Sequence, residues 1–191
     1  MVQDWTRRPG GTGGYLITAT SNSNPRTGND LWALPLSGDK PAGEAVPLLQ
    51  TGFSEWHGRV SPDGRWLAYM SNESKRSEVC VMGFPSRNGR WQVSVNGGSR
   101  PVWNPNGREL YFVGPDNKMM AVEIGSASAR GGGAPFQAGI PKPLFDVRMG
   151  TTSTRSYDVS RDGRFLIASP EEQAGTVPMT VVLNWQAGLN K

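Results

Sequence analysis

Few side chains in this chain of 191 residues could support acid–base or nucleophilic chemistry. The sequence holds one histidine, His57, and one cysteine, Cys80. Histidine titrates near neutral pH, which suits a general base or a ligand-binding group. The alternative for His57, in the segment Glu55–Arg59, is a packed or solvated side chain without a chemical role. Cys80 lies in an alternating apolar run, which favours a buried structural thiol over a nucleophile.

The common motifs of hydrolases and metal sites are missing from the sequence. No Gly-x-Ser-x-Gly elbow occurs. One Ser-x-x-Lys run, Ser37–Lys40, lies in a Gly/Pro-rich segment and not at the start of a predicted helix, so we interpret it as a chance match. A single cysteine excludes an internal disulfide and a Cys-rich zinc site, and a single histidine excludes a site built from several His ligands. We expect no metal and no cofactor, and an enzyme is the less favoured class.

The composition indicates a folded chain with many turns. Glycine (25) and proline (15) make up about one residue in five, against roughly 12% in ordinary proteins. The 7 Trp, 6 Phe and 4 Tyr are spread along the sequence, which argues against low complexity. Only 19% of residues are charged, too few for a long-helix or coiled-coil protein.

Charge and hydropathy limit the partners. The net charge is +4, but the arginines are scattered, so the sequence predicts no nucleic-acid partner. No run of about 18 apolar residues exists, which predicts no membrane insertion. The first residues, Met1–Trp5, lack the apolar stretch of a signal peptide. We therefore expect a soluble chain without an export signal, and the sequence leaves the compartment open.

One motif recurs three times, at Ser61–Arg65, Asn104–Arg108 and Ser160–Arg164, and each copy precedes an apolar run. The separations between its Asp or Asn residues are 43 and 56 positions, and a degraded first copy lies at Trp5–Gly11. Asp-Gly and Asn-Gly supply the positive φ angles of a tight two-residue hairpin. Each motif therefore predicts two strands joined by such a turn.

Aligning the copies on this Asp or Asn places equivalent positions in columns. Two columns stay apolar and are predicted to be core: Val60, Trp103 and Val159 with Trp5, and Leu67, Leu110 and Leu166 with Leu16. A third column, containing Arg59, Val102 and Asp158, changes character. We expect that column to face a channel, a groove or solvent.

Further strands follow each hairpin. Third strands are predicted at Asp30–Leu34, Glu78–Met82, Lys118–Val122 and Thr180–Trp185, and fourth strands at Val46–Leu49, Arg90–Ser94 and Pro143–Val147. A four-stranded unit of about 45–55 residues is typical of a β-propeller blade. The sequence thus predicts an all-β, propeller-type single domain over residues 1–191, with about four blades at 1–51, 52–96, 97–148 and 149–191, the last without its fourth strand.

The repeat resembles a known family. The run Ser61–Tyr69 is similar to the TolB-type, WD-like β-propeller repeats of bacteria, and it narrowly resembles the C-terminal propeller behind some bacterial serine/threonine kinases and winged-helix regulators. Matching stretches are Arg90–Ser94, Gly107–Phe112, Met119–Glu123 and Thr180–Trp185. The resemblance implies the fold and not the function, because propellers host binding and catalysis alike. Kinase-linked members of the family resemble extracytoplasmic sensors.

The number of blades departs from the family pattern. Members usually carry six or more blades, whereas this chain has about four. An incomplete ring exposes sheet faces and strand edges, which favours pairing with another chain. We therefore expect a partial propeller completed by self-association into a homo-oligomer.

Two functions are compatible with these features. The first is a non-catalytic interaction module that presents inter-blade loops to a protein, a peptide or a sugar. Its candidate surface is made of the loops Glu55–Arg59, Gly97–Arg100 and Thr151–Ser156, with ligand-binding residues His57, Arg59, Arg100 and Arg155. The alternative is an esterase-like hydrolase that uses His57 at the channel mouth or at a chain interface. That alternative requires a Ser, Asp or Glu side chain within hydrogen-bond reach of His57.

Overall fold

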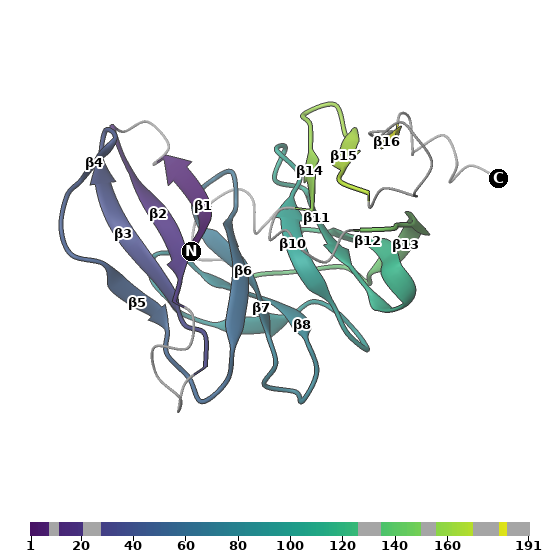
Figure 1. Ribbon diagram of the computed structural model, residues 1–191, viewed down its shortest axis with the longest axis horizontal. Helices are drawn as coiled ribbons and strands as arrows, with labels where there is room; N and C mark the ends of the chain where they lie inside the picture. Colours follow the sequence, from purple (N-terminus) through teal and green to yellow (C-terminus); the bar gives the residue numbers. More distant parts are fainter. Residues whose placement is uncertain (8–11, 21–27, 126–134, 150–155, 170–179, 183–191) are drawn as a thin grey trace.

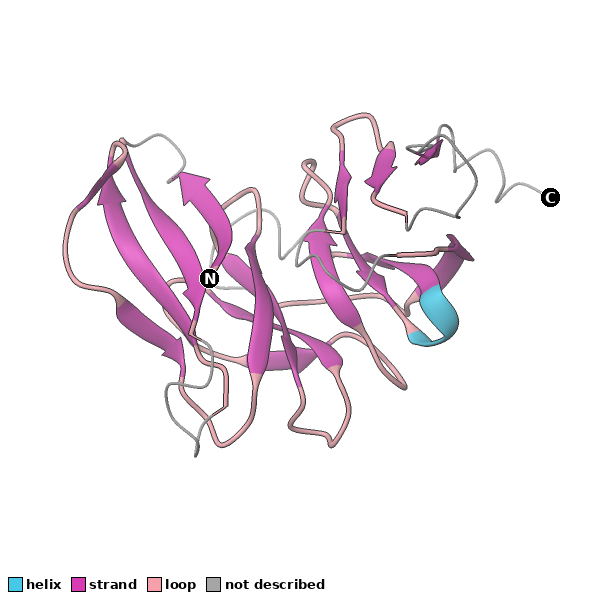
Figure 2. Cartoon of the chain, in the orientation of Figure 1, coloured by secondary structure: helices cyan, strands magenta, loops and turns pink. Residues whose placement is uncertain are grey.

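The computed structural model describes residues 1–7, 12–20, 28–125, 135–149 and 156–169, together with the strand at 180–182. Four antiparallel sheets follow one another along the chain in these residues. The only helical segment among them is one 3-10 turn, η1 (Pro115–Asn117), as Figure 2 shows. The predicted all-β, propeller-type fold is confirmed.

Each sheet is formed by strands that are consecutive in sequence. The first sheet contains β1 (Val2–Arg7), β2 (Gly13–Ala19), β3 (Leu31–Ser37), the short β4 (Lys40–Pro41) and β5 (Val46–Leu49). The second contains β6 (Glu55–Val60), β7 (Trp66–Ser71), β8 (Glu78–Gly83) and β9 (Arg90–Gln92). The third contains β10 (Ser99–Trp103), β11 (Glu109–Val113), β12 (Lys118–Glu123) and β13 (Lys142–Asp146), and the fourth contains β14 (Tyr157–Val159), β15 (Phe165–Ile167) and β16 (Thr180–Val182).

The sheets stand one after another, with their first strands side by side (Figure 1). Strand β1 lies beside β6, β6 beside β10, and β10 beside β14. Three apolar cores fill the spaces between consecutive sheets. The first core packs Ile17 and Leu31 against Leu67 and Tyr69. We call the first strand of each sheet its inner strand, because these four strands lie side by side along the row of sheets.

The repeat motif forms a different turn from the predicted two-residue hairpin. The N–H groups of Gly64, Gly107 and Gly163 donate to the carbonyl oxygen three residues earlier, at 2.8, 2.8 and 3.0 Å. These glycines have φ of 71°, 71° and 79°, while the Asp or Asn before them does not have a positive φ. In the first two copies Pro62 and Pro105 fix a negative φ at the second position, which favours a type I turn with glycine at its end. The third copy closes with the same bond, although Arg161 replaces the proline.

Most of the predicted core columns are buried, and Leu166 is the first exception. Leu67 and Leu110 are fully buried, whereas Leu166 is 48% exposed. The last hairpin is one residue shorter, since the N–H of Ser160 bonds the carbonyl of Arg164. Because side chains alternate between faces, this shift turns Phe165 into the core and Leu166 out of it.

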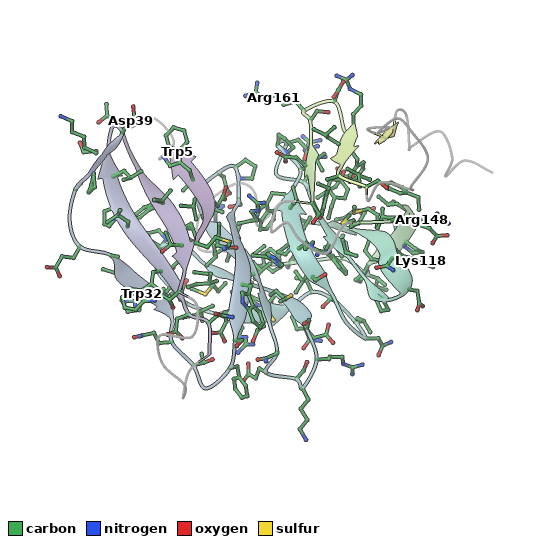
Figure 3. The ribbon with its side chains drawn as sticks, viewed as in Figure 1. Trp5, Trp32, Asp39, Lys118, Arg148 and Arg161 are labelled. Carbon is green, nitrogen blue, oxygen red and sulfur yellow. The ribbon has the colours of Figure 1, made fainter. Side chains whose placement is uncertain are left out.

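Trp5, Leu16 and Val102 also differ from the predictions. Trp5 is 47% exposed and Leu16 is half-buried, because no other described sheet covers their face of the first sheet. Trp5 stands at the surface in Figure 3. Val102 was expected to face a channel, a groove or solvent, but it is buried in the third core. It lies there because the fourth sheet packs on that face, whereas Asp158 is exposed as expected.

Candidate functional site

The inner strands carry a β-bulge at the same place in three sheets. The strand register shifts between Val2 and Asp4 in β1, between Trp56 and Arg59 in β6, and between Ser99 and Val102 in β10. In each case the inner strand has one residue more than its partner. Bulges of this kind redirect side chains and are common beside functional sites.

His57 and Arg100 occupy the bulges of β6 and β10 at equivalent positions. Each lies six residues before the turn residue of its motif, Asp63 or Asn106. Their φ angles are 54° and 53°, in the left-handed region that residues other than glycine seldom adopt. A backbone held this way costs about 1–3 kcal/mol and is typical of binding and catalytic sites. The equivalent position of the fourth sheet is Ser156.

One narrow pocket brings these residues together. Its lining consists of His57, Arg59, Arg100, Pro101, Val102, Ser156 and Tyr157, from three consecutive sheets. The space between them does not admit a water molecule. The structure therefore unites three of the four predicted ligand-binding residues, and Arg155 lies outside the described residues.

The predicted binding loops are partly strands. His57 and Arg59 were placed in a loop before the first strand of their blade, but β6 already begins at Glu55. Arg100 likewise belongs to β10. The bulge interrupts the alternation of apolar and polar residues in β6 and β10, so the sequence pattern did not indicate that these strands begin so early. Residues 151–155 of the third predicted loop lie outside the described part.

Hydrogen bonds between sheets hold the site in place. The backbone N–H of His57 donates to Gln3 Oε1 at 3.1 Å, and the Tyr157 hydroxyl donates to the Arg100 carbonyl at 2.8 Å. The indole Nε1–H of Trp103 donates to the Arg59 carbonyl at 3.0 Å. Sequence inspection missed Gln3 and Tyr157 as supporting residues, because their partners lie more than fifty positions away.

The pocket contains the guanidinium groups of Arg59 and Arg100, and a carboxylate compensates the positive charge of Arg59. Asp4 lies 3.6 Å from the Arg59 guanidinium, and its other oxygen accepts a 2.9 Å hydrogen bond from the N–H of Val60. The Arg100 Nε and the His57 Nδ1 are buried and have no hydrogen-bond partner in the described structure. A buried polar atom without a partner loses the hydrogen bonds that it makes with water. Arg100 therefore keeps unused capacity to bind an acceptor.

The imidazole of His57 is neutral at neutral pH. Burial lowers its pKa to about 4, and the charges of Arg100 and Arg59 act in the same direction. No hydrogen bond joins the imidazole to a serine or a carboxylate among the described residues. The hydrolase alternative thus lacks an activated nucleophile in the part of the chain that the structure describes.

The other candidates for chemistry lie elsewhere. Burial raises the pKa of the Cys80 thiol, which keeps it protonated and unreactive. The pair Ser37 and Lys40 closes a two-residue hairpin between β3 and β4, so its spacing has no helical context. In the described ranges, no cluster of three or more His, Cys, Asp or Glu side chains could hold a metal ion. No described helix is long and apolar enough to cross a membrane.

Comparisons with known proteins match the fold. No family model matches the chain, and no curated protein matches it. Three similar solved structures are TolB from Acinetobacter baumannii (17% identity, TM-score 0.50), a putative TolB from Agrobacterium tumefaciens (13%, 0.53) and a puromycin-hydrolyzing peptidase from Mycobacterium tuberculosis (17%, 0.55). They cover 81%, 86% and 86% of this chain, which spans 46%, 52% and 27% of theirs.

These identities are low, so the likeness concerns the fold alone. It confirms the expected TolB-like, β-propeller-type architecture. The narrower resemblance to propellers linked to kinases or regulators stays a prediction. The chain spans about half of each TolB protein and about a quarter of the peptidase, and the activities of those whole proteins do not carry over to it.

Proposed function

We propose that this chain is a non-catalytic interaction module whose bulged inner strands bind a carboxylate-bearing segment of a protein or peptide. The observation that carries the proposal is the left-handed pair His57 and Arg100, whose buried Nδ1 and Nε atoms have no hydrogen-bond partner among the described residues. Strained residues at equivalent bulges of adjacent sheets are typical of a position selected for binding.

The charge of the site favours an acidic ligand. Arg59 is compensated by Asp4, and His57 is neutral, so among the described residues Arg100 supplies the uncompensated positive charge of the site. Arginine pairs well with carboxylates through parallel N–H donors. A neutral sugar would leave this charge uncompensated, which makes an acidic protein or peptide segment the better ligand.

The width of the pocket favours a macromolecular partner. Its interior does not admit water, so a free small molecule has no cavity to fill. An acidic side chain presented by a partner would instead contact the outer end of the partly exposed Arg100 guanidinium at the pocket mouth. The rest of the affinity would come from the surrounding rim, as in ordinary protein interfaces.

The test is the binding of a fluorescein-labelled hexaglutamate peptide, followed by fluorescence anisotropy. We expect Arg100→Asn to weaken binding at least tenfold, because a hydrogen bond to a charged group contributes roughly 1.5–3 kcal/mol. Asparagine tolerates the left-handed conformation, so the bulge is preserved.

The matched control is Arg108→Asn, which removes the same charge from an exposed turn next to Gly107. We expect it to bind the peptide like the wild type. Equal loss in both variants would mean that net charge alone attracts the peptide and would refute a site at Arg100. A hexalysine peptide should not bind to the wild type.

A further inference from the structure

A cross-strand triple of residues recurs in each sheet on the face that meets the preceding sheet. Its members come from the first, second and third strands, in register. The triples are Val60, Leu67 and Met82 in the second sheet and Trp103, Leu110 and Val122 in the third, and Val159 and Phe165 hold the first two positions in the fourth. In the second and third sheets all three members are buried against the preceding sheet.

The equivalent triple of the first sheet is Trp5, Leu16 and Leu34, and we call its surface the leading face. Trp5 is 47% exposed, and Leu16 and Leu34 are half-buried. In the described part of the chain, no sheet lies on them. The leading face therefore has the side chains of an inter-sheet core, but no described sheet covers it as the preceding sheets cover its equivalents.

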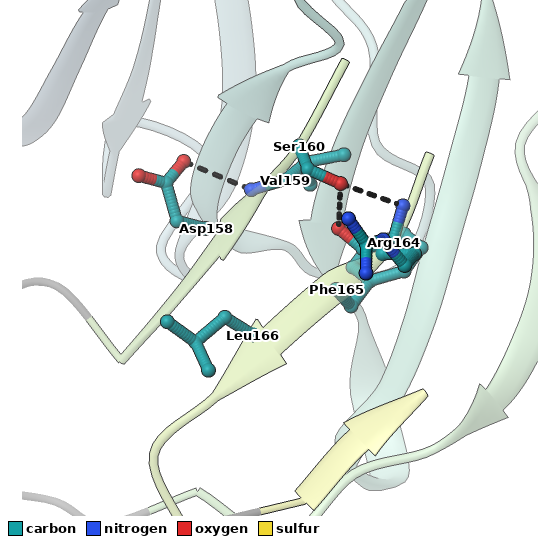
Figure 4. Close-up of a pocket in the computed structure, with 6 residues that line it drawn as sticks. All are labelled: Asp158, Val159, Ser160, Arg164, Phe165 and Leu166. Atoms are coloured by element: carbon teal, nitrogen blue, oxygen red, sulfur yellow. Dashed lines mark hydrogen bonds between the residues drawn. The ribbon is translucent and has the colours of Figure 1, made fainter. Parts of the chain in front are cut away.

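The opposite face of each sheet also has an equivalent position, on the second strand. Ile17, Ala68 and Tyr111 occupy it in the first three sheets, and all three are fully buried against the following sheet. In the fourth sheet this position is Leu166, which is 48% exposed. Figure 4 shows Leu166 beside Asp158, its cross-strand partner, in an open pocket, and we call this surface the trailing face.

Asp158 is equivalent to a residue that already joins two sheets. In the first sheet the same position is Asp4, paired with Ile17 across the strands. Asp4 crosses to the second sheet, where it accepts from the N–H of Val60 and pairs with Arg59. Asp158 instead accepts from the N–H of its own neighbour Val159. The trailing face thus combines an apolar side chain with a carboxylate suited to the next sheet.

We infer that the trailing face of one copy packs on the leading face of a second copy, head to tail. The interface continues the stack of sheets, because each face carries the residue types that build the three cores inside the chain. Leu166 would pack against Leu16, and Asp158 would lie beside Trp5, the equivalent of Val60. The Asp4 carboxylate of the second copy is compensated by its own Arg59.

Two copies can satisfy both ends at once. Each copy supplies four sheets, and a closed pair has eight, within the range of about four to eight blades in propellers. Closure leaves neither apolar face in water, and a closed ring is the favoured result of a head-to-tail contact whose rotation closes. The predicted assembly is therefore a two-copy ring with two identical contacts.

The experiment measures mass by light scattering and sedimentation at micromolar concentration. We expect the wild type at twice the chain mass of 20.7 kDa. Trp5→Glu on the leading face and Leu166→Glu on the trailing face should each raise the dissociation constant at least tenfold, because they place a charge in the contact. Ile140→Glu is the control, since Ile140 is 83% exposed and lies on neither face.

Mixing the two variants distinguishes the head-to-tail contact from other dimers. A Trp5→Glu copy keeps an intact trailing face, and a Leu166→Glu copy keeps an intact leading face. The mixture should therefore form a pair through one wild-type contact, which also shows that both variants are folded.

Three results would overturn the inference. The first is a wild type that remains at the mass of one copy, and the second is a mass that grows beyond two copies with concentration. The third is association that depends on Trp5 but is unaffected by Leu166→Glu, because this would indicate contact between two leading faces. None of these results bears on peptide binding at Arg100, which the anisotropy measurement tests separately.

Discussion

The Tyr157 hydroxyl donates a 2.8 Å hydrogen bond to the carbonyl oxygen of Arg100, and so the fourth sheet holds the strained bulge of the third. Burial raises the pKa of Tyr157 well above its ordinary value, so the hydroxyl remains a donor. We expect Tyr157→Phe to lower the free energy of unfolding by about 1–2 kcal/mol, because a carbonyl at the bulge loses its partner. Urea unfolding followed by tryptophan fluorescence measures this change.

Tyr69 provides the control for that substitution. It is fully buried, and its hydroxyl oxygen has no hydrogen-bond partner in the described structure. Tyr69→Phe removes a group that has already lost its water, so it should leave stability unchanged or raise it by about 1 kcal/mol. Equal losses in the two variants would contradict a specific role for the bond from Tyr157 to Arg100.

His57 predicts a pH dependence of stability. Its pKa is about 4 in the folded chain, against 6.5 for a histidine side chain exposed to water. The unfolded chain therefore binds a proton before the folded chain does, so stability is highest above about pH 6.5 and falls as the pH drops toward about 4. The loss from this residue alone is on the order of 3 kcal/mol.

Asparagine at the same position isolates this effect. His57→Asn keeps a side chain that tolerates the left-handed backbone and removes the titrating group. Unfolding free energies of both proteins, measured in steps from neutral pH down to the folded-state pKa of His57, give a difference curve in which other titrating groups cancel. A flat difference curve would show that His57 does not carry a lowered pKa.

Two glycines separate the effect of a positive φ from that of available space. A Cβ added at Gly107 or at Gly52 would meet no atom within 4 Å, but only Gly107 has a positive φ, of 71°. We expect Gly107→Ala to destabilise the protein by about 1–2 kcal/mol through the left-handed conformation. Gly52→Ala should be neutral or slightly stabilising, because alanine reduces the entropy of the unfolded chain. Thermal unfolding of both variants compares them, and a similar melting temperature for the two would contradict the assignment.

Much of the fold could be predicted because its signals are local. The repeated turn motif marked each hairpin, and the strands at Glu78–Met82 and Val46–Leu49 lie as predicted. The predicted turn type was wrong, and in two of the three copies a proline at the second position outweighs the Asp-Gly or Asn-Gly pair. The length of the last turn could not be predicted, and one residue was enough to exchange Leu166 for Phe165 in the core.

The candidate site was only partly visible in the sequence. His57, Arg59 and Arg100 were predicted as one group, and the structure brings them together in one pocket. Their role in binding a ligand stays a prediction. Their placement in loops was wrong because a bulge interrupts the alternation by which strands are recognised. Counting from the turn motif would also have found Ser156, which shares the column of His57 and Arg100.

The sequence by itself determined the all-β repeat, since turn glycines, prolines and alternating apolar residues act on their immediate neighbours. It also determined which residues have the character of a core, including Trp5, Leu16 and Leu166. Only the tertiary structure decided which of these are covered, because cover comes from another sheet far along the chain. The same reason applies to the site. His57 is neutral because the surrounding sheets bury it beside the charges of Arg100 and Arg59, and packing between sheets also buries the Arg100 Nε without a described partner.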